Sequence, residues 1–330
     1  MLQTKNAPYP VPDRLPLLEG LCWNIADPYQ LTPEQMLGIY EERWHFKDVL
    51  GYPSATESIY IQQLITRYGG LPLLDRNNQS KEDIFEVLTR ILARLNRDLL
   101  IEHQAFLAGG ALISLKYDQM RYSQDLDFLI EPKNYQQLKA TIKDGAEVLT
   151  PEEGLKIGEP RIDRYGIRYP LEINCGDKTI IFKLEIVAEY SLAIDGNDSF
   201  NNIPCLNLVD RITSKLTTNA DRWADRNKFS RDLIDLAIIA SKEGKIPAAA
   251  ITKATNIYSS VEKDLIQSIE QFQNLPDYRA ECYSNLQISR PEVIANGLDY
   301  LAVLYQLDIM QRSFKETQAH SRQIVAPAHD

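Results

Sequence analysis

The sequence lacks the patterns typical of secreted proteins, zinc proteins and membrane proteins. It has four cysteines, which are far apart and form no CxxC pair: Cys22, Cys175, Cys205 and Cys282. A disulfide framework or zinc knuckle is therefore not indicated, and we expect reduced thiols. No run approaches the roughly 18 apolar residues that a membrane span requires, and the first thirty residues lack a basic start followed by an apolar stretch. We expect a cytoplasmic protein with no membrane partner.

Signatures of hydrolases and of P-loop proteins are also missing. The four histidines form no HExxH motif, no GxSxG elbow occurs, and no GK[ST] follows a glycine-rich loop. Acidic residues outnumber basic ones, 46 to 36, so the formal net charge is -10. A general nucleic-acid coat is thereby disfavoured, since non-specific binding depends on Lys and Arg neutralising phosphates. A local basic surface is still compatible with this composition.

The first part of the chain is rich in proline. The prolines of residues 1 to 33 are Pro8, Pro10, Pro12, Pro16, Pro28 and Pro33. Because proline lacks a backbone donor, we expect this arm to be extended and not to form a folding unit. Helices are expected at 33 to 47, capped by Thr32, and at 54 to 68, closed by Gly69 and Gly70.

Hydrophobic periodicity divides the remaining chain into a mixed part and a helical part. Residues 81 to 96 form a strongly amphipathic pattern, followed by the short strand QAFLAGG, a helix from ALISLKY, the buried strand DLDFLI and a polar helix at 133 to 143. RYGIRYPLEIN and KTIIFKLEIVAEY indicate a hairpin turning at Gly176 and Asp177. Helices are then expected at 208 to 224, 231 to 242, 247 to 257, 259 to 273 and 291 to 307.

This order predicts an α/β (α+β) fold with a small mixed sheet wrapped by helices and a C-terminal helical lobe. We divide the chain into a proline-rich arm with helices (1–80), a core (81–205) and a helical domain (206–330).

Two aspartates occur two residues apart on the predicted strand DLDFLI. Side chains alternate faces along a strand, so Asp125 and Asp127 project to one side, while Leu126 and Phe128 project to the other. Paired carboxylates repel each other unless cations compensate them, and Mg²⁺ bound through carboxylates and substrate phosphates would do so. The alternative is structural: one aspartate ends the strand and the other binds a nearby arginine such as Arg121.

A glycine pair precedes this strand at a strand-to-helix junction. Gly109 and Gly110 would leave backbone N–H groups free at the start of a helix, where the dipole favours a phosphate. A double glycine is also a common tight turn. Together, the turn and the aspartates suggest a phosphate cradle beside two metal ligands.

The stretch LAGGALISLKYDQMRYSQDLDF resembles the first motif of the DNA polymerase β-like nucleotidyltransferases, and most closely that of the AbiEii/AbiGii toxin family. Its second half matches the family pattern at Arg121, Ser123, Asp125, Asp127 and Phe128. Ala111 departs from it, because the family usually has Ser or Thr there, so one hydroxyl contact to phosphate is lost while the amides of Gly110 and Ala111 remain. The resemblance implies that Gly109, Gly110, Ala111, Arg121 and Ser123 contribute to nucleotide binding.

The resemblance also implies a third metal carboxylate on a neighbouring strand. Glu185 in IIFKLEIVAE is the expected residue, with Glu172 in PLEIN as its competitor. An exposed glutamate on a half-buried strand is the alternative reading.

A second informative stretch lies at residues 208 to 239. Helical spacing places Arg211, Lys215, Asn219, Arg222 and Arg226 on one face, which predicts a basic ridge suited to an RNA backbone. A merely solvated helix face is the alternative. The stretch also resembles the family's downstream signature at Lys215, Arg231, Asp232, Asp235 and Leu236. By that resemblance Lys215 and Arg231 would hold phosphate, and Asp232, followed by Asp235, would orient the nucleotide or act near the chemical step. Asp232 would begin a helix capped by Ser230.

The resemblance therefore implies a nucleotidyltransferase that moves NMP from an NTP to an acceptor, with Asp125, Asp127, Lys215 and Asp232 as catalytic residues. Mg²⁺ or Mn²⁺ would be held by Asp125, Asp127 and Glu185. The expected acceptor is RNA, in particular the 3′ end of tRNA, and the expected role is that of a type IV toxin with a cognate antitoxin in abortive infection. The alternatives are transfer to a protein or a small molecule such as an aminoglycoside, and a non-catalytic nucleotide-binding protein, which Ala111 makes plausible.

Overall fold

The computed structural model describes residues 10–23, 25–44, 53–68, 81–123, 125–142, 147–175, 178–196 and 198–317. The chain forms two compact units. Unit 1 comprises Met1–Leu99 and Gln136–Val187, and unit 2 comprises Leu100–Tyr135 and Ala188–Asp330. The units thus interleave along the chain.

The N-terminal helices of unit 1 share a small core of their own. They are α1 (Pro16–Leu21), the 3-10 helix η1 (Pro28–Gln30), α2 (Pro33–Arg43) and α4 (Ala55–Tyr68). The expectation of an extended arm is wrong for residues 16 to 30, because Pro16 and Pro28 stand at the first helical position, where a missing N–H costs nothing. The Thr32 cap is confirmed: its hydroxyl accepts from Gln35 N in a capping box. Gly69 and Gly70 lie outside the described residues.

The rest of unit 1 is built around the predicted hairpin, which is confirmed. β5 (Gly166–Cys175) and β6 (Lys178–Ala188) pair antiparallel, while the proposed turn residues Gly176 and Asp177 lie outside the described residues. β3 (Leu155–Ile157) and β4 (Arg161–Ile162), both missed from the sequence, pair with β5. The predicted helices α5 (Lys81–Arg94) and α8 (Pro132–Thr141) are present.

Unit 2 contains a mixed sheet. β1 (Phe106–Leu107) pairs antiparallel with β2 (Asp125–Ile130) and parallel with β8 (Ile203–Cys205), which pairs antiparallel with β7 (Asp198–Phe200). Asn201 and Asn202, with φ of 49° and 63°, form the two-residue turn between β7 and β8. α6 (Arg97–Glu102) precedes β1, and α7 (Gly109–Lys116) packs against β2.

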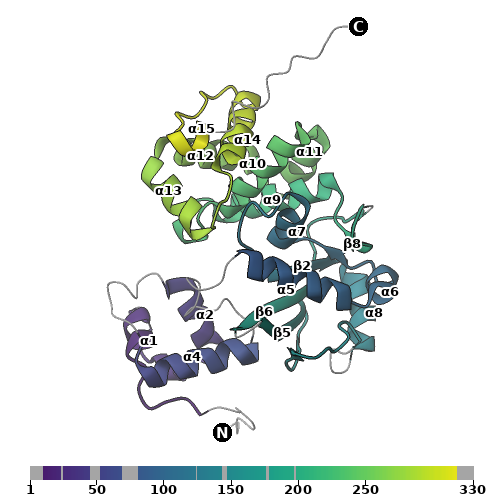
Figure 1. The fold of residues 1–330 in the computed structure, drawn as a ribbon, viewed down its shortest axis with the longest axis vertical. Coiled ribbons are helices and arrows are strands. Elements are labelled where there is room, and N and C mark those ends of the chain that lie inside the picture. The colour runs from purple at the N-terminus through teal and green to yellow at the C-terminus, as the bar shows by residue number, and fades with distance from the viewer. Residues whose placement is uncertain are drawn as a thin grey trace. The chain divides into compact units, whose positions relative to one another are not determined.

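The C-terminal part of unit 2 is helical, as predicted. Its helices are α9 (Leu208–Arg222), η3 (Arg226–Lys228), α10 (Arg231–Glu243), α11 (Ala248–Ile257), α12 (Val261–Asn274), α13 (Pro276–Asn285), α14 (Pro291–Leu304) and α15 (Phe314–Thr317). α10 packs against α9 and α14, and one continuous apolar core joins them to α7 (Figure 1). α13 was missed, because PDYRAECYSN has no clear apolar stripe.

The predicted fold class is thereby confirmed: a small mixed sheet with helices and a C-terminal helical lobe. Among the described residues, no helix is long and apolar enough to cross a membrane. The described thiols of Cys22, Cys205 and Cys282 are free and buried.

Candidate active site

The turn between β1 and α7 lies directly on β2. Ala108 N donates to Asp127 O at 2.8 Å, which fixes the turn against the strand. Gly109 has a φ of +69°, and a Cβ at this position would stand 2.3 Å from Asp127 Oδ2. Glycine is required here for both conformation and space. Ala108, the residue before α7, has no side chain that could cap the helix.

The second glycine makes room for two other side chains. A Cβ on Gly110 would stand 2.0 Å from Arg121 Nη2 and 2.9 Å from Ser123 Oγ. The structure thus brings the glycine turn, Arg121, Ser123 and Asp127 together, as the sequence motif suggested. Ala111 follows in the helix and is fully buried.

The alternation predicted for β2 is confirmed. Leu126 and Phe128 are fully buried, whereas Asp125 and Asp127 are partly exposed on the opposite side of the strand. Both carboxylates therefore share one face within unit 2.

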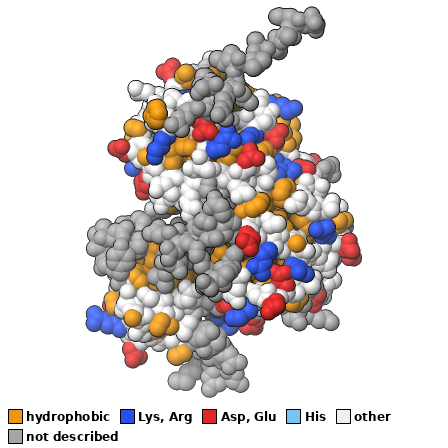
Figure 2. Space-filling model, viewed as in Figure 1, with side chains coloured by type: hydrophobic (Ala, Val, Ile, Leu, Met, Phe, Trp, Pro, Cys, Tyr) orange, Lys and Arg blue, Asp and Glu red, His pale blue; other side chains and the backbone are white. Residues whose placement is uncertain are grey.

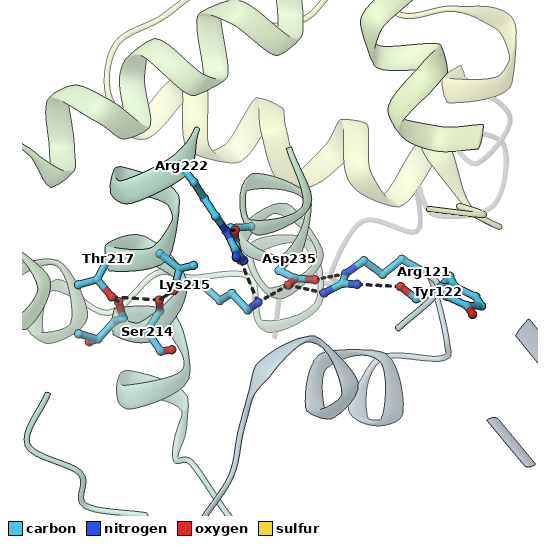
Figure 3. Close-up of polar contacts among 10 residues, drawn as sticks. Arg121, Tyr122, Ser214, Lys215, Thr217, Arg222 and Asp235 are labelled. Carbon is cyan, nitrogen blue, oxygen red and sulfur yellow. Dashed lines mark hydrogen bonds and ion pairs between the residues drawn. The ribbon is translucent and has the colours of Figure 1, made fainter. Parts of the chain in front are cut away.

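An ion-pair network of three cations and two carboxylates joins the loop before β2 to α9 and α10. Asp235 accepts from Arg121 through both of its oxygens, with Nη2 to Oδ2 at 2.8 Å, and lies 2.7 Å from Lys215 Nζ. Asp232 lies 3.0 Å from Lys215 Nζ and accepts from Arg222 Nε at 2.7 Å. Figure 3 shows Asp235 between Lys215 and Arg121.

Local structure positions each member of this network. Asn207 caps α9 by accepting from Asp210 N, and Lys215 and Arg222 follow two turns apart on that helix. Asp232 and Asp235 lie in the first turns of α10, where the helix dipole favours negative charge.

Burial makes these contacts strong and costly to break. The exposed fractions of the Arg121, Asp232 and Asp235 side chains are 4%, 3% and 0%. Burial alone would raise the pKa of Asp232, but Lys215 and Arg222 outweigh it and lower that pKa. Burial likewise would lower the pKa of Arg121, but Asp235 outweighs it and raises that pKa. The charged forms are therefore the stable ones, and removal of one partner would leave an uncompensated buried charge.

Arg231 differs from the other cations of the site. Its side chain is partly buried, and within the described part of the chain it makes no hydrogen bond or ion pair. Burial and the like charge of Arg222 lower its pKa, although Asp232 and Asp125 oppose the shift. Arginine nevertheless stays protonated in proteins. An anion at this position would add a direct ion pair to the longer-range attraction of Asp232 and Asp125.

Three members of the basic ridge that was predicted along α9 are buried and do not face solvent. The exposed fractions of Arg211, Lys215 and Asn219 are 3%, 6% and 2%. Arg211 donates to Asp198 at 2.9 Å and to Tyr117 Oη at 2.8 Å, and Asn219 donates to Ser268. The expectation is wrong for these three residues, because helical spacing cannot tell a solvated polar face from one buried against other helices. The other two members differ, since Arg222 is partly exposed and Arg226 is exposed. On the face drawn in Figure 2, basic and acidic side chains are interspersed.

Glu185 and Glu172 belong to unit 1. Glu185 accepts from Arg168 Nε at 2.8 Å across the β5–β6 pair and lies 3.0 Å from Lys183 Nζ. Glu172 accepts from Lys156 at 3.1 Å. Their role as third carboxylate stays a prediction.

The paired aspartates fit a divalent cation. Among the described residues, no group of three or more His, Cys, Asp or Glu side chains is placed to hold a metal. Mg²⁺, however, keeps several waters and is commonly bound through one or two carboxylates together with substrate phosphates. Asp125 and Asp127, on one partly exposed face of β2, supply those oxygens.

Sequence reasoning missed how this site is supported. Ser230 does not cap α10 with its side chain; it has a φ of 47°, and its hydroxyl contacts Tyr278 instead. The loop before β2 is tied to the end of α13, because Tyr122 N donates to Leu286 O at 2.8 Å. Tyr278 and Leu286 carry no motif that could have identified them.

Comparison with known proteins points to one family. The family model described as nucleotidyl transferase AbiEii toxin, type IV TA system, matches residues 90–294. Two solved structures show similarity at 19% identity: a candidate nucleotidyltransferase from H. pylori, with a TM-score of 0.39, and JHP933 from Helicobacter pylori, with a TM-score of 0.40. The alignments cover 69% of this chain and 95% and 92% of those chains, respectively. No curated protein matches the sequence.

Proposed function

Because this chain belongs to the AbiEii nucleotidyl transferase toxin family of type IV toxin–antitoxin systems, we propose that it transfers a nucleoside monophosphate from an NTP to an RNA acceptor. An acceptor hydroxyl oxygen forms a bond to the α-phosphorus of the NTP, and its O–H bond breaks as the proton passes to solvent. The bond from that phosphorus to the bridging oxygen breaks, and pyrophosphate leaves.

The unpaired cation Arg231 is the observation that supports this proposal best. It lies within electrostatic range of Asp125 and Asp232, so a triphosphate there would meet positive charge beside the carboxylate pair. Arg121, Lys215, Arg222 and Arg231 provide four positive charges, which balance the four negative charges of Asp125, Asp127, Asp232 and Asp235. A divalent cation held by Asp125 and Asp127 would leave a positive surplus that favours a polyanionic substrate.

The residues of the site take distinct roles in this proposal. The Gly109–Gly110 turn holds the terminal phosphates with its backbone amides. Arg231 holds negative charge that grows on the phosphoryl oxygens in the transition state, an electrostatic contribution that does not require proton transfer. Lys215 and Asp232 lie 3.0 Å apart and form an ion pair. In this proposal the pair keeps the start of α10, and with it Arg231, in place beside the substrate.

Asp125 and Asp127 would hold Mg²⁺ or Mn²⁺. When bound, the metal supplies Lewis-acid activation of the attacking oxygen and neutralises charge on the leaving pyrophosphate.

The third carboxylate can be identified by comparing two glutamates. Glu185→Gln is expected to weaken Mg²⁺ binding, so that more metal is needed for half-maximal activity. Glu172→Gln should leave the required Mg²⁺ concentration unchanged. Titration of both variants with Mg²⁺ tests this, and equal curves would exclude Glu185.

The domain assignment stays as predicted from the sequence: 1–80 as N-terminal arm and helices, 81–205 as transferase core, and 206–330 completing the active site. The pairing of Arg121 with Asp235 supports the last point, because it brings α10 to the loop before β2. The cytoplasm, where NTPs and tRNA meet, is the proposed location, and a cognate antitoxin the proposed partner.

Labelling separates the acceptor classes. The protein is incubated with each labelled NTP, Mg²⁺ and total cell RNA or protein, and compared with the Asp125→Ala/Asp127→Ala variant. We expect RNase-sensitive label on RNA in the tRNA size range, and none with the variant. Label on protein or on a small molecule such as an aminoglycoside would replace RNA as acceptor. Mg²⁺-dependent nucleotide binding without label anywhere would indicate a non-catalytic protein and overturn the proposal.

A further inference from the structure

The turn that leads into α10 has an unusual backbone. Phe229 and Ser230 both have positive φ, 52° and 47°, and neither is glycine. Residues with a Cβ avoid this region, so two in succession persist only where the surroundings hold them. Arg231 follows directly as the first residue of the helix. The direction in which the Arg231 side chain points therefore depends on the conformation of this turn.

One side chain from another helix contacts the turn on two sides. Tyr278, in α13, is 5% exposed, and its Oη lies 3.1 Å from Ser230 Oγ. Its ring lies 5.3 Å from the guanidinium carbon of Arg226, at the other end of the turn. Two backbone bonds flank these contacts: Phe229 N donates to Arg226 O, and Ile234 N donates to Ser230 O, both at 2.9 Å.

We infer that Tyr278 is a positioning residue that holds the Phe229–Ser230 turn and thereby orients Arg231 toward the substrate phosphates. The part concerning phosphate rests on the proposed function, whereas the effect on the turn does not. Tyr278 itself touches no substrate. Ser230 is nearly buried, and its Oγ contacts the Tyr278 hydroxyl and, as a weaker partner on the same helix, the Cys282 thiol. Without the Tyr278 hydroxyl, the strained turn loses the stronger of these two contacts.

Tyr283 offers a matched control on the same helix. Tyr278 and Tyr283 both pack edge-on against Phe272, with ring centroids at 6.5 and 5.9 Å. Each has a hydroxyl with a side-chain partner, but that of Tyr283 donates to Glu316 at 2.9 Å, on α15. Tyr278→Phe and Tyr283→Phe therefore remove the same atom from the same helix, and only the first affects the turn.

Amide hydrogen exchange tests the turn without any ligand. In Tyr278→Phe the amides of Phe229 and Ile234 should exchange about fivefold faster than in the wild-type protein, the effect expected for one lost hydrogen bond. In Tyr283→Phe they should exchange at the wild-type rate. Equal exchange at both amides in the two variants would overturn the inference, whether or not the protein is a transferase.

Binding and kinetics test the link to Arg231. Calorimetric titration with inorganic tripolyphosphate and Mg²⁺ should give an affinity about fivefold weaker for Tyr278→Phe, with KM for NTP rising more than kcat falls. In an Arg231→Ala background the same substitution should change neither quantity, because the group it orients is absent. A fivefold effect that persists without Arg231 would show that Tyr278 acts by another route. Failure of the wild-type protein to bind tripolyphosphate or NTP would instead refute the proposed function.

Discussion

Arg121 and Asp235, separated by 114 positions in the sequence, form a buried ion pair through two hydrogen bonds. Paired hydrogen bonds of this kind fix both position and orientation, because the planar guanidinium matches the carboxylate. The pair ties the loop before β2 to the first turns of α10, and Gly110 leaves the space that the guanidinium needs. The glycine turn and the helical lobe are therefore linked through one side chain.

Loss of the Asp235 charge should destabilise the protein strongly. Asp235→Asn leaves Arg121 without its counter-charge in a fully buried position, so we expect the free energy of unfolding to fall by about 3–5 kcal/mol. Urea denaturation measures it. Asp118→Asn is the matched control, because Asp118 pairs with Lys242 at an exposed site and should contribute at most about 1 kcal/mol. Equal effects would mean that the buried pair is energetically unimportant.

Gly110→Ala should lower activity strongly and also destabilise the protein, because it separates the buried pair of Arg121 and Asp235. The added methyl would occupy the place of Arg121 Nη2, 2.0 Å away, and the guanidinium would have to leave Asp235. We expect kcat/KM for labelled NTP to fall by about a hundredfold or more. Gly38→Ala is the control: a Cβ there meets nothing within 4 Å, and helical alanine is favoured by about 0.5–1 kcal/mol. Normal activity of Gly110→Ala would contradict this geometry.

Removal of Arg231 should reduce activity and increase stability. A cation in the first turn of a helix opposes the dipole, so Arg231→Ala is expected to raise the free energy of unfolding by about 0.3–1 kcal/mol. Loss of its charge at the substrate should lower kcat/KM about tenfold to hundredfold. Arg290→Ala serves as control, because Arg290 stands at the start of α14 and is paired with Glu292. Loss of stability together with activity would indicate a structural role for Arg231.

Acid should weaken the network through Asp232. Lys215 and Arg222 hold the pKa of Asp232 below its unfolded value of about 3.9, despite the opposing effect of burial. Its stabilisation is therefore complete above that value and is lost as pH falls toward the folded pKa. Below pH of about 4 the wild-type free energy of unfolding should fall more steeply than that of Asp232→Asn, by up to about 1.4 kcal/mol per pH unit. Urea denaturation between pH 6 and pH 3 measures both slopes, and parallel slopes would contradict the assignment.

Local patterns in the sequence predict most of the elements that form the site. The apolar run around Leu126 and Phe128 identifies β2, and its period of two places Asp125 and Asp127 on one face. The glycine pair indicates a turn into a helix, and glycine proves necessary for contacts with Asp127 and Arg121. These predictions succeed because each depends on neighbours within a few residues.

The partners of the charged side chains could not be predicted in this way. Arg121 was weighed as a partner for the aspartates of β2, and its ion pair is with Asp235, far along the chain. Lys215 belongs to a polar face that periodicity assigns to solvent, and the fold buries it. Only tertiary packing decides which polar stripe meets other helices.

Glu57 links three of the N-terminal helices through hydrogen bonds. This fully buried carboxylate accepts from Leu17 N at 3.0 Å, Leu18 N at 2.8 Å and Tyr40 Oη at 2.7 Å. Without α1, Glu57 would lose both amide donors in a buried position, which costs free energy unless the carboxylate finds new partners. The N-terminal helices therefore depend on α1 for more than apolar packing.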